Sequence, residues 1–133
     1  MRELQKRGIQ IPAPGGNQWS RDADEKSGMD AYVHLCFKRG HPMEKSAVDG
    51  GNIKDLRRLQ IKPIVIKLAG AMITNDVANK SGVVPGDPAT MLDQLDLEVL
   101  YKRTDWRDEA IRKRLVVAEK CELLIPHHIP LEY

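Results

Sequence analysis

The stretch that decides the fold is KCELLIPHHIP, residues 120–130, near the C-terminal end of the chain. Its segment CELLIP is short, apolar and closed by a proline, which is typical of a buried strand. Because side chains alternate along a strand, Glu122 is expected to share a face with Leu124, whereas Leu123 and Ile125 point to the other face. A carboxylate therefore stands at the head of an apolar strand.

Two further apolar runs predict strands. AYVHLCF, residues 31–37, is rich in aromatic and β-branched side chains, and PIVIKLAG, residues 63–70, is the clearest strand pattern in the chain. The polar residues 17–30 are expected to form a long loop. Residues 1–11 are expected to hold the end of a short helix that closes near Gly8, before the breaker PAPGG.

Three segments predict helices. GGNIKDLRRLQ offers Asn52 as an N-cap, and DPATMLDQLDLEVLYKR offers Asp87 as a cap before Pro88. DWRDEAIRKRLVVAEK places Ile111 and Leu115 on one face, with acidic residues at its N-terminal end. Helices and strands are mixed without regular alternation, so the predicted class is α+β, in a single domain over residues 1–133.

The composition is that of an ordinary globular protein, with 41% apolar and 30% charged residues. The net charge of +2 neither requires nor excludes a nucleic-acid partner. No apolar stretch approaches the ~20 residues that span a bilayer, and a cytoplasmic protein is expected. No metal is expected, because cysteines and histidines lack zinc-ligand spacing. Cys36 and Cys121 are expected to be buried, reduced thiols.

Glu122 has two interpretations. A solvated carboxylate at a strand end is the commoner one, whereas a carboxylate at a cleft stabilises developing positive charge during a reaction. His34, which lies between apolar residues, is more often a structural histidine than a base or a ligand. The sequence alone leaves both interpretations of Glu122 open.

The segment YVHLCFKRGHPM, residues 32–43, runs from an aromatic strand into cations, as single-stranded nucleic-acid sites do. A core position is the commoner role for Phe37 and Cys36. Two basic clusters are also present, and a solvated surface is their commoner explanation. Their members are Arg107, Arg112, Lys113 and Arg114, and Lys54, Arg57, Arg58 and Lys62.

Taken together, three stretches resemble the DarT family of DNA-thymidine ADP-ribosyltransferase toxins. YVHLCFKRGHPM is similar to that family's YVPFYF strand with its PRxPM-like turn. PIVIKLAGAMITNDVAN is similar to an apolar strand followed by a TDGNAA-like loop, and KCELLIP is similar to QAEFLVP. The order agrees from about Ile9 to the C-terminus. The resemblance implies an ADP-ribosyltransferase fold, a split β-sandwich with surrounding helices.

The resemblance implies transfer of ADP-ribose from NAD to thymine in single-stranded DNA, in the cytoplasm, with Glu122 as the catalytic carboxylate. It also implies a macrodomain antitoxin as a partner. Further site residues follow from it. Arg21 is assigned to catalysis and NAD binding, Tyr32 and Phe37 to NAD binding, and Lys38, Arg39 and Met43 to DNA binding.

The chain departs from the family at its start. Family members begin with a histidine-bearing segment that contributes to NAD binding, and LQKRGI resembles only the end of that segment. This difference favours a second hypothesis, a catalytically silent domain that binds nucleic acid or an antitoxin. A third is a small ribonuclease using His34, His127 or His128 as acid and base.

Overall fold

The computed structural model describes residues 18–51, 53 and 55–133. The short helix expected near Gly8, the PAPGG breaker and the Asn52 cap lie outside these residues. Helices and strands are mixed, as the α+β prediction requires. Within the described part, no helix is long and apolar enough to cross a membrane.

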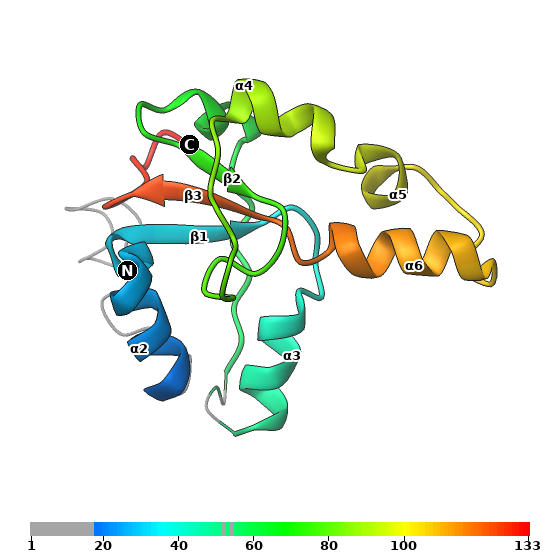
Figure 1. Ribbon diagram of the computed structural model, residues 1–133, viewed down its shortest axis with the longest axis horizontal. Coiled ribbons are helices and arrows are strands. Elements are labelled where there is room, and N and C mark those ends of the chain that lie inside the picture. Colours follow the sequence, from blue (N-terminus) through cyan, green and yellow to red (C-terminus); the bar gives the residue numbers. More distant parts are fainter. Residues whose placement is uncertain (1–17, 52, 54) are drawn as a thin grey trace.

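The described strands form one three-stranded antiparallel sheet, in the order β1-β3-β2 (Figure 1). Its strands are β1 (Tyr32–Cys36), β2 (Met72–Thr74) and β3 (Glu122–Pro126). The strands predicted at residues 31–37 and in CELLIP are thereby confirmed. Cys36 of β1 and Thr74 of β2 both lie opposite Glu122, so all three side chains share one face of the sheet.

The other face of the sheet carries the main hydrophobic core. Val33, Ile73, Leu123 and Ile125 come from all three strands and are at most 6% exposed. Burial of their apolar surface is the main force that holds the sheet together. The sheet therefore has an apolar face toward the core and a face that carries Glu122.

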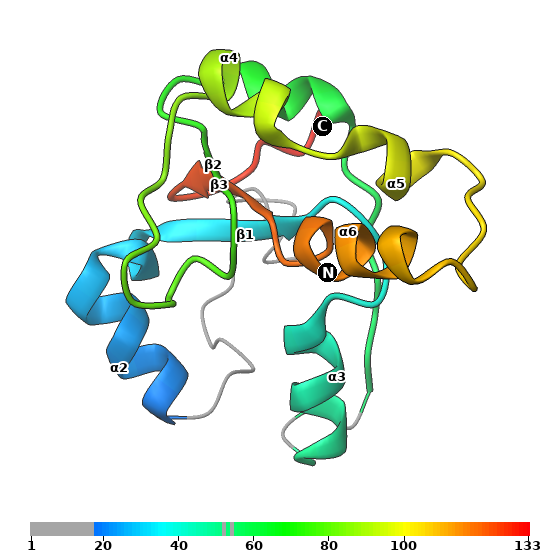
Figure 2. The ribbon, with the colours of Figure 1, turned by 45° about the vertical axis from the view of Figure 1, so that its right-hand side comes forward.

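Helices surround the sheet on its two sides (Figures 1 and 2). α2 and α3 lie on the β1 side, and α4 lies on the β2 side. α5 and α6 contact each other and bury a second, smaller core of Val99, Leu100 and Ala118. The bounds are α2 (Gln18–Ser27), η1 (Met29–Ala31), α3 (Pro42–Asp49), η2 (Pro63–Lys67), α4 (Pro88–Met91), η3 (Leu92–Gln94), α5 (Leu97–Tyr101) and α6 (Glu109–Ala118).

Side-chain caps begin the helices that were predicted correctly. The Asp87 carboxylate accepts the Ala89 N–H at 2.7 Å, before Pro88 at the first position of α4. Asp108 accepts the N–H groups of Ala110 and Ile111 at the start of α6. These bonds satisfy backbone donors that a helix start leaves without partners.

Three predictions of secondary structure are wrong. Residues 17–30 are not a loop, because residues 18–27 form α2, a polar helix with no buried residue and hence no apolar stripe to reveal it. No helix forms over residues 55–60; α3 lies upstream instead. PIVIK is a 3₁₀ helix that begins with Pro63, and the strand β2 follows Gly70, which has a left-handed φ of 77°.

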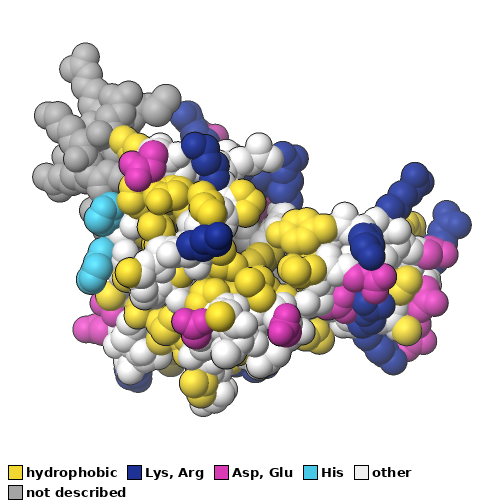
Figure 3. Space-filling model, turned by 90° about the horizontal axis from the view of Figure 1, so that it is seen from above, with side chains coloured by type: hydrophobic (Ala, Val, Ile, Leu, Met, Phe, Trp, Pro, Cys, Tyr) yellow, Lys and Arg dark blue, Asp and Glu magenta, His cyan; other side chains and the backbone are white. Residues whose placement is uncertain are grey.

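Figure 3 looks onto the side of the molecule where α4 and the C-terminus lie, and it shows apolar side chains gathered on that surface. η2 and the C-terminal segment are joined there by the Lys62 N–H, which donates to the Tyr133 carbonyl at 2.9 Å. Ile64 and Leu131, from these two segments, are each about half exposed. Partial exposure of apolar side chains is common in globular proteins.

Candidate active site

Glu122 lies at the start of the central strand and is only 6% exposed. Its backbone N–H donates to the Thr74 hydroxyl at 3.2 Å, across the β2–β3 pair. The interpretation of Glu122 as a solvated carboxylate at a strand end is therefore wrong. A buried carboxylate has to be compensated by donors, because removing a charge from water is costly.

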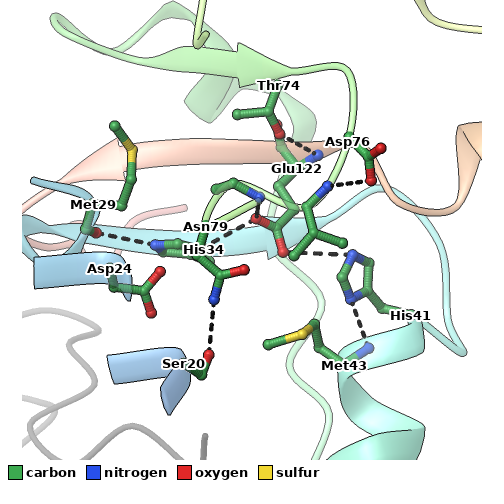
Figure 4. Close-up of polar contacts among 12 residues, drawn as sticks. Ser20, Asp24, Met29, His34, His41, Met43, Thr74, Asp76, Asn79 and Glu122 are labelled. Carbon is green, nitrogen blue, oxygen red and sulfur yellow. Dashed lines mark hydrogen bonds and ion pairs between the residues drawn. The ribbon is translucent and has the colours of Figure 1, made fainter. Parts of the chain in front are cut away.

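Three donors from three segments face the Glu122 carboxylate (Figure 4). The Ala78 N–H donates to Oε2 at 3.0 Å, and His34 Nδ1 lies 3.3 Å from the same oxygen. His41 Nε2 lies 3.5 Å from Oε1. The last distance is long for a hydrogen bond, but it is within the range of electrostatic attraction.

His34 bridges Glu122 and the backbone. Its Nε2 lies 3.0 Å from the Met29 carbonyl, so both ring nitrogens face acceptors. Burial lowers the pKa of His34, but the contacts with Glu122 and the Met29 carbonyl outweigh burial and hold the pKa above its usual value. The arrangement fits an imidazolium that donates to Glu122 and to Met29.

The raised pKa of His34 predicts a fall in stability as pH rises. Because the folded state binds this proton more tightly than the unfolded state, the contribution is complete below pH ~6.5 and is lost as pH rises through the folded pKa. In thermal melts from pH 6 to 9, His34→Gln should remove part of the decline in Tm seen in the natural chain. Equal slopes in both proteins would contradict the assigned protonation.

Asp24 of α2 lies beside His34 (Figure 4). Burial raises its pKa, the charge of His34 lowers it, and Glu122 raises it again. Its Oδ1 is buried and has no hydrogen-bond partner among the described residues. His34 thus lies between two carboxyl groups, which reinforces its positive charge.

The segment between β2 and α4 crosses the face of the sheet that carries Glu122 (Figure 1). Its ends are joined by two backbone hydrogen bonds of 2.9 Å between Ile73 and Gly86. In its middle, Ala78 binds Glu122, and the Asn79 amide donates to the Ser20 hydroxyl of α2 at 2.8 Å. Residues 75–85, here called the cover loop, therefore close over Glu122.

The structure brings some of the predicted site residues to this face. Tyr32 is half-buried on β1 and shares the face of Glu122. Cys36 also shares it and is exposed, so the prediction of a buried thiol is wrong for Cys36 and confirmed for Cys121. Phe37, just after β1, is half-buried against both hydrophobic cores, as expected for a core residue.

The remaining predicted residues lie on α2 and at the connection between β1 and α3. Arg21 is exposed on α2, where it donates to Gln18 at 2.8 Å. Lys38 lies 3.6 Å from Glu119, and Arg39 is exposed between β1 and α3. Met43 is half-buried in the first turn of α3, close to His41 (Figure 4). Lys38, Arg39 and Met43 therefore lie in or directly after the segment that connects β1 to α3, whereas Arg21 lies on α2.

Several cations of the two basic clusters are paired with neighbouring groups. Arg114 donates to Asp96 and Glu98, Lys113 lies 2.8 Å from Glu109, and Arg107 stacks on Trp106. In the second cluster, Arg57 and Arg58 pair with Asp55 and Glu44, and Lys62 donates to the Glu132 carbonyl. Pairing of this kind fits a solvated surface, as the sequence favoured.

The described residues contain no group of three or more side chains arranged to hold a metal ion. An open hollow of about 560 Å³ lies in the loop between α5 and α6, lined by Arg103–Arg107. It is formed by five consecutive residues and brings no polar groups from other elements together, so Glu122 remains the better candidate.

Sequence reasoning missed Asp24, Thr74 and Ala78, and it named His41 only as a cation after the aromatic strand, without connecting it to Glu122. Asp24 lay in a segment interpreted as a loop. For His41 a signal was present, because it directly precedes a proline that begins a helix. The Ala78 contribution is a backbone N–H, which no residue type reveals.

No protein-family model matches this chain, and no curated protein or solved structure is significantly similar to it. The site therefore has to be interpreted from its own geometry and from the motif resemblance in the sequence.

Proposed function

We propose that this chain is an ADP-ribosyltransferase that transfers ADP-ribose from NAD to a thymine base in single-stranded DNA. One observation carries the proposal. The carboxylate that the motif resemblance assigns to catalysis, Glu122, is the one carboxylate on the described strands, and it is buried and oriented by three donors. The ADP-ribosyltransferase-like fold is part of the same proposal, with the described sheet as one part of the sandwich.

The chemistry requires a fixed negative charge. The bond between nicotinamide and the ribose breaks with its electron pair leaving on nicotinamide, and positive charge develops on the ribose carbon. A ring nitrogen of thymine then forms the new bond to that carbon and loses its proton to water. A carboxylate that is already oriented stabilises the positive charge without reorganisation in the transition state. Glu122 would supply that charge.

The other assigned residues fit around this step. Tyr32 shares the sheet face of Glu122 and would contact NAD together with Phe37 and Arg21. Lys38 and Arg39 lie between β1 and α3, Met43 lies in the first turn of α3 next to His41, and all three would contact DNA. A base in a single strand can enter such a site without being flipped from a duplex. A macrodomain that removes ADP-ribose is the proposed antitoxin.

The experiment that tests the proposal incubates the chain with NAD and a single-stranded oligonucleotide that contains thymine. Mass spectrometry should show the addition of one ADP-ribose group to the oligonucleotide. An oligonucleotide in which every thymine is replaced by cytosine is the matched control and should remain unmodified. Modification of both, or of neither, would contradict thymine as the acceptor.

A silent binding domain is the second candidate, and the burial of Glu122 beneath the cover loop favours it. Such a domain would bind single-stranded DNA without turning over NAD. Calorimetry distinguishes the two functions. Heat of NAD binding together with nicotinamide release supports the transferase, whereas DNA binding without any response to NAD supports the silent domain.

A ribonuclease is not favoured by the geometry. Both ring nitrogens of His34 and of His41 face Glu122 or a backbone group, which leaves neither ring placed to exchange a proton with a substrate. His127 and His128 are exposed beyond the end of β3.

Entry of a substrate to Glu122 requires the cover loop to open. Asn79→Ala removes the bond to Ser20 and should increase the open population about fivefold, since a hydrogen bond contributes ~1 kcal/mol. Hydrogen exchange at the Ala78 amide should accelerate by the same factor. Asn75→Ala, at an exposed position of the same loop, is the matched control and should leave the exchange unchanged. Equal exchange rates at Ala78 in both variants would contradict the role of the Asn79–Ser20 bond in holding the cover loop closed.

A further inference from the structure

His41 is the most deeply buried histidine of the described chain, at 5% exposure, and it connects a helix start to Glu122. It is the N-cap of α3, where its Nδ1 accepts the Met43 N–H at 3.2 Å. A nitrogen that accepts a hydrogen bond carries no proton, so the proton of the neutral ring lies on Nε2. Nε2 points at Glu122 Oε1 (Figure 4).

We infer that His41 is a positioning residue, a neutral Nε2–H tautomer fixed by the N-terminus of α3, which orients Oε1 of Glu122. Protonation of Nδ1 would place two donors against each other and remove the cap from α3. Nε2 has no hydrogen-bond partner among the described residues apart from its approach to Oε1 at 3.5 Å. A buried N–H donor is stable only when it has an acceptor, and the Glu122 carboxylate is the acceptor that faces Nε2.

The two histidines therefore differ in their protonation. His34 faces two acceptors, an arrangement that fits the protonated ring, whereas His41 faces one donor and one acceptor. Oε2 is occupied by His34 and the Ala78 N–H, which leaves Oε1 with a single, longer contact. Oε1 is the oxygen that remains for a substrate.

In the proposed transferase reaction, His41 would set the direction of Oε1 toward the ribose, and this part of the inference rests on the proposed function. The effect would be on the chemical step, because His41 does not itself touch the substrate. A misdirected carboxylate lowers kcat and leaves the KM for NAD nearly unchanged.

The first test measures the tautomer directly and needs no activity. Nitrogen-15 NMR of the chain at pH 7 should show His41 as the Nε2–H tautomer, with the Nδ1 resonance of an unprotonated acceptor. A His41 ring protonated on Nδ1 would overturn the inference. A lack of transferase activity would refute the proposed function and leave this result unaffected.

The second test separates capping from positioning. His41→Asn retains a side-chain acceptor for the start of α3 but removes the donor to Glu122, because asparagine is a strong N-cap and is shorter. The carboxyl ¹³C resonance of Glu122 should shift while the amide resonances of α3 stay in place, and kcat should fall between about tenfold and a hundredfold. An unchanged Glu122 resonance, or an unchanged kcat in an active enzyme, would overturn the positioning role.

Discussion

Replacing Glu122 with glutamine is expected to lower kcat for ADP-ribosyl transfer by at least about a hundredfold. Glutamine retains the size of the side chain but removes the negative charge that stabilises the ribose cation. The donors from Ala78, His34 and His41 would then face a side-chain amide. The amide accepts hydrogen bonds only at its oxygen, so at least one of these donors would lose its acceptor. A loss of stability of about 1–3 kcal/mol is expected from this mismatch.

The measurement follows ADP-ribosylated oligonucleotide over time under single-turnover conditions. Circular dichroism checks that the variant is folded at the assay temperature. Glu109→Gln is the matched control, because Glu109 is exposed on α6 and pairs only with Lys113 there. Activity of the Glu122→Gln variant within a few fold of the Glu109→Gln control would refute the catalytic role of Glu122.

Ile125→Ala is expected to cost the fold about 2–5 kcal/mol, a larger loss of stability than Glu122→Gln causes. Ile125 is 1% exposed on the central strand, opposite Val33 and within the main core. Truncation leaves a cavity within the main core, whose members come from all three strands. Since domains of this size have total stabilities of roughly 5–15 kcal/mol, a large share of the total is lost.

Urea unfolding followed by fluorescence measures the change in free energy of unfolding. Ile125→Val keeps most of the side-chain volume and should cost only about 0.5–1.5 kcal/mol. If the alanine variant lost no more stability than the valine variant, the central position of β3 in the core would be refuted.

Strands β1 and β3 and helices α4 and α6 could be predicted because local sequence and tertiary packing agree in them. Asp87 and Asp108 mark helix starts, and CELLIP is apolar enough to require burial. α2 could not be predicted, since it contributes no buried residue and has no apolar stripe. PIVIK has the composition of a strand, but Pro63 and the turn at Gly70 favour a 3₁₀ helix with the strand after it.

The candidate site was predicted only in part. Glu122 stood out because a carboxylate in an apolar strand is unusual, whereas His34, between apolar neighbours, was interpreted as a structural histidine. The contact between His34 and Glu122 depends on the pairing of β1 with β3, because the two residues are 88 positions apart in the chain. His41 and the Ala78 N–H reach Glu122 from segments that only the folded chain brings together. Sequence spacing carries no information about contacts of that range.

Release of nicotinamide from NAD labelled in the nicotinamide ring tests the central claim most directly, because it reports bond cleavage whatever the acceptor is. The natural chain should release labelled nicotinamide, faster with thymine-containing single-stranded DNA, and Glu122→Gln should reduce the release at least about a hundredfold. Equal release by the natural chain and the Glu122→Gln variant, or none by either, would contradict the assignment of Glu122 as the catalytic carboxylate of an ADP-ribosyltransferase.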